Sequence, residues 1–225
     1  MIPALIYLLI KKLRKRNAGR ITTKFFYRKN QIAFTFLVLL ILMSCILFAQ
    51  QTLTYKVVRD GNEIGWMKLD KTITGNTTLI NMVSEMKVRM IFLFTIVSSE
   101  YAEFRDGKMI HSYVFRKMNG NIKANKHLRL QNDGYEVENS SGKEKLTIEP
   151  ITFNILSMYF GEPAGLSKIY SNTQQDFAAV EKIKNNDYKL HLPDGNCTEY
   201  YYNNGICTKV KINHNLYSAE FILNQ

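Results

Sequence analysis

The chain has 225 residues, a formal net charge of +11 and a sequence pI near 9.5, which at first suggest a nucleic-acid-binding protein. However, nine of its 30 Lys and Arg lie upstream of Ile32. The other 21 are nearly balanced in charge by 19 Asp and Glu, the first of which is Asp60. Residues 50–225 therefore carry about +2. They contain no run of basic residues of the kind that binds nucleic acid, so we expect no nucleic-acid partner.

The first 49 residues have the organisation of an export signal. A basic lead-in, residues 1–31, precedes the uncharged run 32–49, which ends in the small residue Ala49 before Gln50. This order of basic, apolar and small residues is typical of secretory signals. The lead-in would hold the N-terminus in the cytoplasm. The sequence therefore predicts contact with the membrane through residues 32–49, at least during export, and one exported domain over residues 50–225.

The fate of the apolar run is open between three alternatives. Its length is at the lower limit for a membrane-spanning helix and slightly above that of a usual cleaved signal. Cleavage after Ala49 is favoured by the small residue at that position, while a retained anchor is the second alternative. The third is a lipoprotein, because Leu42-Met43-Ser44-Cys45 has the outline of a lipobox in which Cys45 would be acylated. A translation start near Arg28 would remove most of the lead-in.

Turn signals divide residues 50–225 into short segments rich in β-branched and aromatic residues. The dipeptides are Asp60-Gly61, Gly75-Asn76, Asp106-Gly107, Asn119-Gly120, Asp133-Gly134, Ser141-Gly142, Asp194-Gly195 and Asn204-Gly205. Such dipeptides between β-rich segments are typical of hairpins. Their spacing predicts a mainly β domain built as an antiparallel meander, which forms a curved sheet or partial barrel with one short helix. An apolar helix in the leader would precede it.

Alternation of side chains predicts strands with one buried and one solvated face. In residues 122–130, Ile122, Ala124, Leu128 and Leu130 fall on one face, opposite Lys123, Asn125, His127 and Arg129. Only Lys126 breaks this pattern. Ile206, Val210 and Ile212 oppose Lys209 and Lys211 in the same way.

Two segments have no polar face. Residues 90–97 read MIFLFTIV, and residues 151–160 read ITFNILSMYF between Pro150 and Gly161, which predicts a short helix there. We expect the two segments to meet and form the apolar heart of the domain. A sealed core is favoured over an open groove that would take a hydrophobic ligand. The candidate core or ligand residues are Phe92, Phe94, Phe153, Leu156 and Phe160.

Catalytic and metal-binding motifs are missing from the sequence. The four histidines do not have the spacing of a metal site, so no metal or other cofactor is predicted. Glu149 and Glu162, which flank the expected helix, and Asp194 could do acid–base chemistry, but capping and turn formation are the favoured roles. Residues 200–202, three tyrosines, alternate between the faces of a strand and are expected to pack there.

Cys197 and Cys207 are predicted to remain unlinked. The Asn204-Gly205 turn places Cys207 opposite residue 201 or 202, which is four or five residues from Cys197 on the same strand. At about 3.3 Å per residue the gap is roughly 13–17 Å. A disulfide needs Cα atoms within about 7 Å, so this pair cannot form one.

A set of short motifs extends from about Gln50 to Leu223. They are Gly61, Ile64-Gly65, Glu149-Pro150-Ile151, Tyr159-Phe160, Glu162-Pro163, Leu192-Pro193-Asp194-Gly195, Tyr200, Tyr202, Asn204-Gly205 and Phe221. In this pattern the chain resembles a family of exported proteins of Bacteroidota catalogued as domain of unknown function 6134. The resemblance implies an all-β domain in the envelope of a Gram-negative bacterium and supplies no activity. Asn172 departs from it, because an acidic residue is expected there.

The function expected from the sequence is that of a non-enzymatic periplasmic or envelope domain that binds a hydrophobic or peptidic partner. One alternative is an envelope-acting enzyme that uses an isolated carboxylate. Another is a structural adapter that docks to an envelope protein by a sheet edge. Convergence of Glu149, Glu162 and Asp194 in one cleft would favour the enzyme.

Overall fold

The structure, a computed structural model, describes residues 49–89, 93–184, 186–214 and 217–224. In this part of the chain fourteen strands form a single sheet, in which every pair of neighbours is antiparallel. The first eight strands are β1 (Ala49–Arg59), β2 (Asn62–Thr74), β3 (Thr77–Arg89), β4 (Leu93–Arg105), β5 (Lys108–Met118), β6 (Asn121–Gln131), β7 (Gly134–Asn139) and β8 (Gly142–Leu146). After the 3-10 turn η1 (Ser157–Tyr159) come β9 (Lys168–Ser171), β10 (Asp176–Lys184), β11 (Asp187–His191), β12 (Cys197–Asn203), β13 (Ile206–His214) and β14 (Tyr217–Leu223).

The sheet consists of two meanders joined through the first and last strands. Its order runs from β8 through β1 to β14 and then back to β9. Tyr55 of β1 is paired with Leu223 of β14, and Val57 with Phe221. The sheet is not closed, because β8 and β9 are its two edges. The predicted mainly β, antiparallel fold with a curved, partly closed sheet is confirmed.

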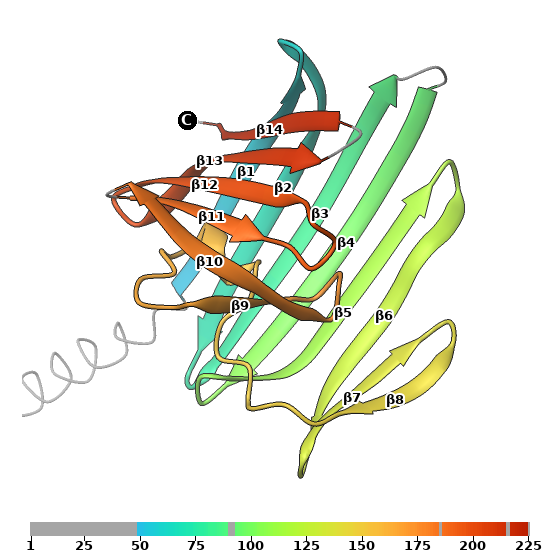
Figure 1. Ribbon diagram of the computed structural model, residues 1–225, viewed down its shortest axis with the longest axis vertical. Coiled ribbons are helices and arrows are strands. Elements are labelled where there is room, and N and C mark those ends of the chain that lie inside the picture. Colours follow the sequence, from blue (N-terminus) through green and yellow to red (C-terminus); the bar gives the residue numbers. More distant parts are fainter. Residues whose placement is uncertain (1–48, 90–92, 185, 215–216, 225) are drawn as a thin grey trace, which may run out of the picture. The chain divides into compact units, whose positions relative to one another are not determined.

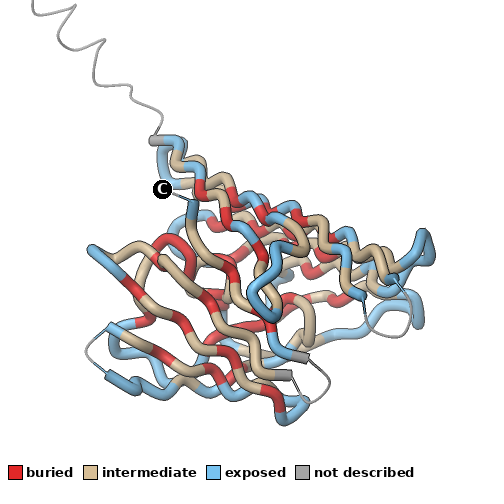
Figure 2. Tube along the Cα trace, turned by 90° about the horizontal axis from the view of Figure 1, so that it is seen from above, coloured by how far each residue is buried: buried red, intermediate tan, exposed pale blue. Residues whose placement is uncertain are grey.

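The sheet curls so that its two halves face each other. Figure 1 shows the long strands β2–β5 side by side, with the shorter strands β9–β14 crossing in front of them. Buried and exposed positions alternate along the strands of both halves (Figure 2). The inward residues of the two halves form one continuous apolar core.

The predicted turn dipeptides all lie where one strand ends and the next begins, with Gly134 and Gly142 as the first residues of β7 and β8, and this prediction is confirmed. At the turn between β1 and β2, Asp60 and Gly61 both have positive φ, 50° and 79°. Two consecutive positive φ angles match the twist of a tight hairpin, and Asp-Gly is among the sequences that adopt them most readily. Local sequence therefore determined where each of these strands ends.

The predicted helix over residues 151–160 is wrong. Residues 151–156 are not helical, and only Ser157–Tyr159 forms the single turn η1. The Ile155 amide donates to the Tyr170 carbonyl at 3.0 Å, and Asn154 forms a parallel bridge to Tyr170 of β9. Backbone pairing with an edge strand replaces the helical hydrogen bonds, because an uncovered edge would leave its polar groups unpaired.

The segment 150–160 nevertheless seals one end of the domain. The Tyr135 hydroxyl accepts from the Ile151 amide at 2.9 Å and donates to the Met109 carbonyl at 2.9 Å. Tyr159 packs edge-on against Tyr55, with ring centroids 5.4 Å apart. These contacts bind the segment to β1, β5 and β7.

The expected meeting of the two apolar segments is also wrong for the residues described. Met90, Ile91 and Phe92 lie outside those residues, but Phe94 lies at the start of β4. The sealed end lies near Phe104, which pairs with Met109. Ten residues separate Phe94 from Phe104, or about 33 Å along the strand. The two segments therefore serve opposite ends of the sheet.

Two smaller expectations concern cysteines and exposed positions. Cys207 pairs with Tyr202 and both cysteines are free, so the predicted register and the absence of a Cys197–Cys207 link are confirmed. Ile122, expected on a buried face, is 60% exposed because it lies beyond a register shift at Arg116.

No helix among the described residues is long and apolar enough to span a bilayer. The leader helix expected over residues 32–49 lies outside them except for Ala49, which is the first residue of β1.

Candidate functional site: an apolar pocket at one end of the sheet

The inward side chains of β4 change character along the strand. They begin with the apolar Phe94 and Ile96, continue with the polar Ser98 and Glu100, and end with the apolar Ala102 and Phe104. Residues on the same face of a strand follow every second position, so these six form one line. Along β4, the line therefore consists of an apolar end, a polar band and a part of the sealed core.

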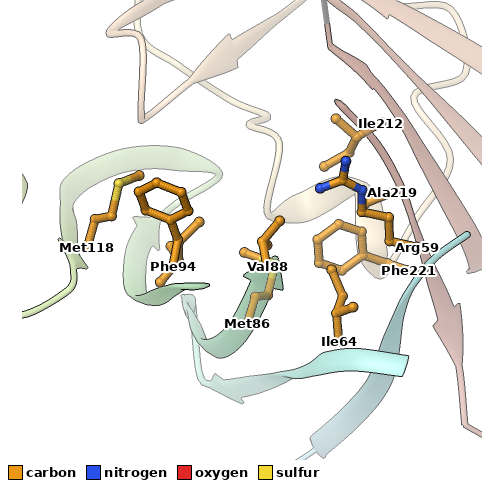
Figure 3. Close-up of a pocket in the computed structure, with 10 residues that line it drawn as sticks. Arg59, Ile64, Met86, Val88, Phe94, Met118, Ile212, Ala219 and Phe221 are labelled. Carbon is orange, nitrogen blue, oxygen red and sulfur yellow. The ribbon is translucent and has the colours of Figure 1, made fainter. Parts of the chain in front are cut away.

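The apolar end contains a pocket of about 270 Å³ that is partly open to solvent. Nine of its ten lining residues are apolar. Figure 3 shows Phe94, Val88 and Met118 on one side and Phe221, Ala219 and Ile212 on the other. The complete lining is Arg59, Ile64, Met86, Val88, Phe94, Ile96, Met118, Ile212, Ala219 and Phe221.

Strand register brings the lining residues together. Phe94 pairs with Val88, and Ile96 pairs with both Met86 and Met118, so one row of inward side chains crosses β3, β4 and β5. Cross-strand pairs of this kind place side chains about 5 Å apart on the same face. The wall on this side of the pocket is therefore continuous.

Gly65 allows β2 to approach β3 beside the pocket. A Cβ atom at Gly65 would lie 2.1 Å from the Glu85 carbonyl oxygen, a distance that no side chain tolerates. The register between β1 and β2 shifts at Val57, opposite Gly65. Ile64 thus reaches the pocket next to a position that only glycine can occupy, which gives a physical reason for the Ile64-Gly65 motif.

Arg59 is the charged residue in the pocket lining. It follows Tyr55 and Val57 on the inward face of β1, and its side chain is 21% exposed. Its Nη1 is buried and has no hydrogen-bond partner. Its Nε lies 3.5 Å from a carboxylate oxygen of Asp60, whose side chain is 79% exposed. This contact is weak because water screens an exposed pair.

The polar band centres on Glu100. Thr173, in the turn between β9 and β10, donates to the Glu100 carboxylate at 3.0 Å, and Arg116 lies 3.9 Å from it. Burial raises the pKa of Glu100, and the charge of Arg116 and the Thr173 hydrogen bond only partly oppose this. Lys126 donates to the Thr173 carbonyl at 2.7 Å. The band thus fastens the β9–β10 turn to the inner face of β4–β6.

Asn172, where an acid was expected, belongs to the same turn. It is 4% exposed, and its Oδ1 accepts from Asn154 Nδ2 at 3.3 Å, while its own Nδ2 is buried without a partner. An acid here would present a carboxylate instead of that amide. The presence of Asn172 in place of the expected acid therefore changes hydrogen bonding inside the domain and not on its surface.

Sequence reasoning missed Glu100, Arg116 and Arg59. One signal for the band was present, because Lys126 breaks the alternation of its strand, and the structure shows that it points inward to Thr173. Glu100 occupies the same face of β4 as Ser98 and Ala102, so its inward position could also be inferred from the sequence. Its partner Thr173 lies 73 residues away and could not be inferred.

The residues expected at a hydrophobic site are divided by the structure. Phe94 lines the pocket. Leu156 and Phe160 are 2% and 8% exposed and belong to the sealed core. Phe153 is half-buried and lines a separate hollow beside Phe177 of β10. Phe92 and the candidate lipidation residue Cys45 lie outside the described residues.

The three carboxylates weighed for catalysis have separate surroundings. Glu149 does not cap a helix, since none begins near it, and the hollow that it lines includes neither Glu162 nor Asp194. Glu162 accepts from the Tyr188 hydroxyl at 3.3 Å. Asp194 accepts from the Asn196 amide at 3.0 Å, which is the predicted turn role.

The tyrosine run behaves as predicted. Tyr200 and Tyr202 are buried on the inward face, whereas Tyr201 lies on the other face under the Lys209 ammonium, 4.4 Å from its ring centroid. His127, on the outward face of β6, packs against Tyr113 at 4.5 Å. Among the residues with defined positions, no three His, Cys, Asp or Glu side chains gather as a metal site would require.

Comparison with known proteins supports the fold and supplies no activity. Residues 55–224 match the family described as domain of unknown function DUF6134. A crystal structure of a β-barrel-like protein of the domain of unknown function DUF1849 from Brucella abortus is similar, with a TM-score of 0.56 and 14% sequence identity. The match covers 80% of this chain and 97% of the other. None of the curated proteins compared with the chain matches it.

Proposed function

Because the chain belongs to the DUF6134 family, a domain of unknown function, its role has to be argued from its site, and we propose that it is a non-enzymatic envelope domain that binds a small hydrophobic ligand. The observation that carries this proposal is the pocket of about 270 Å³ with nine apolar lining residues. Concave, mostly apolar pockets with few polar groups are the usual form of small-molecule sites. A well-packed core would have filled such a space.

A small ligand fits this site better than a peptide or a docking protein. The volume lies just below the roughly 300–1,000 Å³ of sites for drug-sized ligands, which favours a slender molecule. Peptides often add to a free sheet edge, but β8 exposes Lys143, Glu144 and Lys145, and β9 is paired with residues 153–155. The pocket therefore supports ligand binding more strongly than the edges support an adapter.

Two variants of β4, one on each face of the strand, test the pocket. Phe94→Gln places an amide in the lining, and Val97→Gln places the same amide on the outer face, where Val97 is 42% exposed. We expect N-phenyl-1-naphthylamine, a neutral probe that fluoresces in apolar surroundings, to bind saturably at one site per chain. Its affinity should fall about tenfold in Phe94→Gln, which corresponds to roughly 1.4 kcal/mol, and stay unchanged in Val97→Gln. Equal affinities, or no saturable binding, would contradict the proposal.

Export to the periplasm or envelope of a Gram-negative bacterium is part of the same proposal. It is supported by the basic lead-in and uncharged run of residues 1–49. Strand β1 begins at Ala49, so cleavage after that residue would leave the strand almost complete. We expect N-terminal sequencing of the protein from the periplasmic fraction to begin at Gln50. Retention of residues upstream of Ile32 would instead favour the anchor, and an acylated Cys45 the lipoprotein.

The alternative is an envelope-acting enzyme with an isolated carboxylate, and Glu100 is the residue that favours it. A carboxyl group whose pKa is raised by burial can act as a general acid nearer to neutral pH. Against this, Thr173 and Arg116 already contact Glu100, and Glu100 does not line the pocket. Loss of a hydrolytic activity on envelope material in Glu100→Gln, with probe binding intact, would favour the enzyme over the binding protein.

A further inference from the structure

The orientation of Arg59 makes the pocket amphipathic. Tyr55 and Val57 precede Arg59 on the inward face of β1 and are fully buried, so an apolar residue would continue the pattern. In Figure 3 the Arg59 guanidinium extends beside Phe221 and Ala219 toward Ile212. One end of an otherwise apolar lining therefore carries a positive charge.

The Arg59 guanidinium is incompletely paired within the domain. Nη1 is buried without a partner, and the contact with Asp60 is made through Nε at 3.5 Å. A buried donor without a partner is unfavourable, and more so when it is charged. Guanidinium groups pair most strongly with planar carboxylates, which accept two parallel hydrogen bonds. A carboxylate ligand would satisfy the free donor, whereas a neutral ligand of the same shape would not.

The pocket volume limits the length of the apolar part. If each methylene needs about as much space as a water molecule, roughly 30 Å³, then 270 Å³ holds about nine carbons. Two such chains side by side would need about twice this volume. A single medium-length chain fits, and the remainder of a longer chain would extend through the open side of the pocket.

We infer that the pocket binds a single-chain fatty carboxylate, with the alkyl chain among Phe94, Ile96 and Met118 and the carboxylate paired to Arg59. This inference rests on the proposed function, because it assumes that the pocket takes an apolar ligand. It adds the sign of the head group, the number of chains and the residue that selects them. Arg59 is the specificity-determining residue of the site.

Competition between ligands that differ only in the head group tests this assignment. N-phenyl-1-naphthylamine bound to the mature protein, as recovered from cells, is displaced by decanoate, decanol or decyltrimethylammonium at pH 8. We expect decanoate to displace the probe at about tenfold lower concentration than decanol, since one charge-assisted hydrogen bond contributes that much. Decyltrimethylammonium should be the weakest competitor, and added salt should reduce the preference for decanoate.

Variants of β1 assign the preference to Arg59. Arg59→Gln should abolish the advantage of decanoate and leave the affinity for decanol unchanged, while Arg59→Lys should keep part of it. Lys56→Gln removes an exposed cation from the same strand and should change nothing. Thermal unfolding monitors folding, and the salt dependence of the wild-type protein serves as the test if Arg59→Gln does not fold.

The outcomes separate this inference from the proposed function. If decanoate and decanol compete equally, or if Arg59→Gln keeps the preference, the head-group assignment is wrong while the apolar pocket stands. If decyltrimethylammonium competes best, the assignment is wrong as well. If neither the probe nor any ligand binds saturably, the proposed function itself is wrong.

Discussion

The two ends of the long strands β1–β5 are both lined by apolar side chains, but within the described residues a covering segment packs on only one of them. At the sealed end, residues 150–160 cover β1, β5 and β7 and bring Leu156 and Met158 into the core. At the other end, Phe94, Ile96 and Met118 line a pocket. Inward apolar residues are therefore insufficient to distinguish a core from a binding site. What distinguishes them is whether another segment of the chain packs on top.

The polar band separates the two ends. Glu100, Arg116 and Lys126 lie on inward positions between them, and Thr173 joins the band from the opposite half of the sheet. Buried charged groups are costly unless they are hydrogen-bonded, so this band contributes little to the stability of the domain. On the inner face of β4–β6 it forms a polar boundary, beyond which the pocket begins, whereas the inward positions of β1 remain apolar from Leu53 to Val57.

The largest stability effect is expected at the sealed end, in Leu156→Ala. Leu156 is 2% exposed, so its truncation removes buried surface and leaves a cavity. We expect the free energy of unfolding to fall by about 2–5 kcal/mol in chemical denaturation. A loss below about 1 kcal/mol would show that residues 150–160 do not seal this end.

Tyr135→Phe should have the next largest effect. The Tyr135 hydroxyl bonds both the Ile151 amide and the Met109 carbonyl, and its removal leaves two buried backbone groups unpaired. The expected loss is about 1–3 kcal/mol in the free energy of unfolding. Tyr201→Phe removes a hydroxyl from the outward face of β12, where it bonds Glu199, and should change stability by less than about 0.5 kcal/mol. Equal losses in the two variants would remove the anchoring role of Tyr135.

Glu100→Gln should make stability less dependent on pH. Because burial raises the pKa of Glu100 above its ordinary value of 4.5, the folded protein binds the proton more tightly than the unfolded chain. The stabilisation from the protonated carboxyl is therefore complete below pH 4.5 and is lost as pH rises through the folded-state pKa. In that window the wild-type protein should lose up to about 1.4 kcal/mol per pH unit relative to Glu100→Gln.

Denaturation at several pH values measures this difference. Glu144→Gln, which removes an exposed carboxylate from β8, is the matched control and should reproduce the wild-type profile. A wild-type protein that gains stability relative to Glu100→Gln as pH rises would mean that the Arg116 contact outweighs burial.

The smallest stability effect is expected at the open end, in Phe94→Ala. Phe94 is only half-buried and lines a pocket, so its loss enlarges an existing space. We expect less than about 1 kcal/mol in the free energy of unfolding, well below the 3–5 kcal/mol typical of a buried phenylalanine. Binding of the neutral probe should nevertheless weaken. A loss as large as that of Leu156→Ala would show that this end is also core.

The sequence by itself determined the local elements of this domain. Dipeptides such as Asp60-Gly61 specify tight hairpins through backbone angles that few other residues adopt. Alternation then gave the inward face of most of β6, although not at Ile122, and the turn at Asn204 gave the register that keeps Cys197 and Cys207 apart. These features depend on neighbours within a few residues, so they could be read without the fold.

Only the tertiary structure decided what covers each inward face. Residues 151–160 lie between Pro150 and Gly161, which are typical residues at the two ends of a helix. They pair with β9 instead, because that edge needed hydrogen-bond partners. Pairing of β1 with β14 joins the first and last strands of the domain, and it places Arg59 beside Phe221. The contact of Glu100 with Thr173 likewise spans the two halves of the sheet. Pattern within a strand carries no information about such distant partners, because they meet only when the sheet curls.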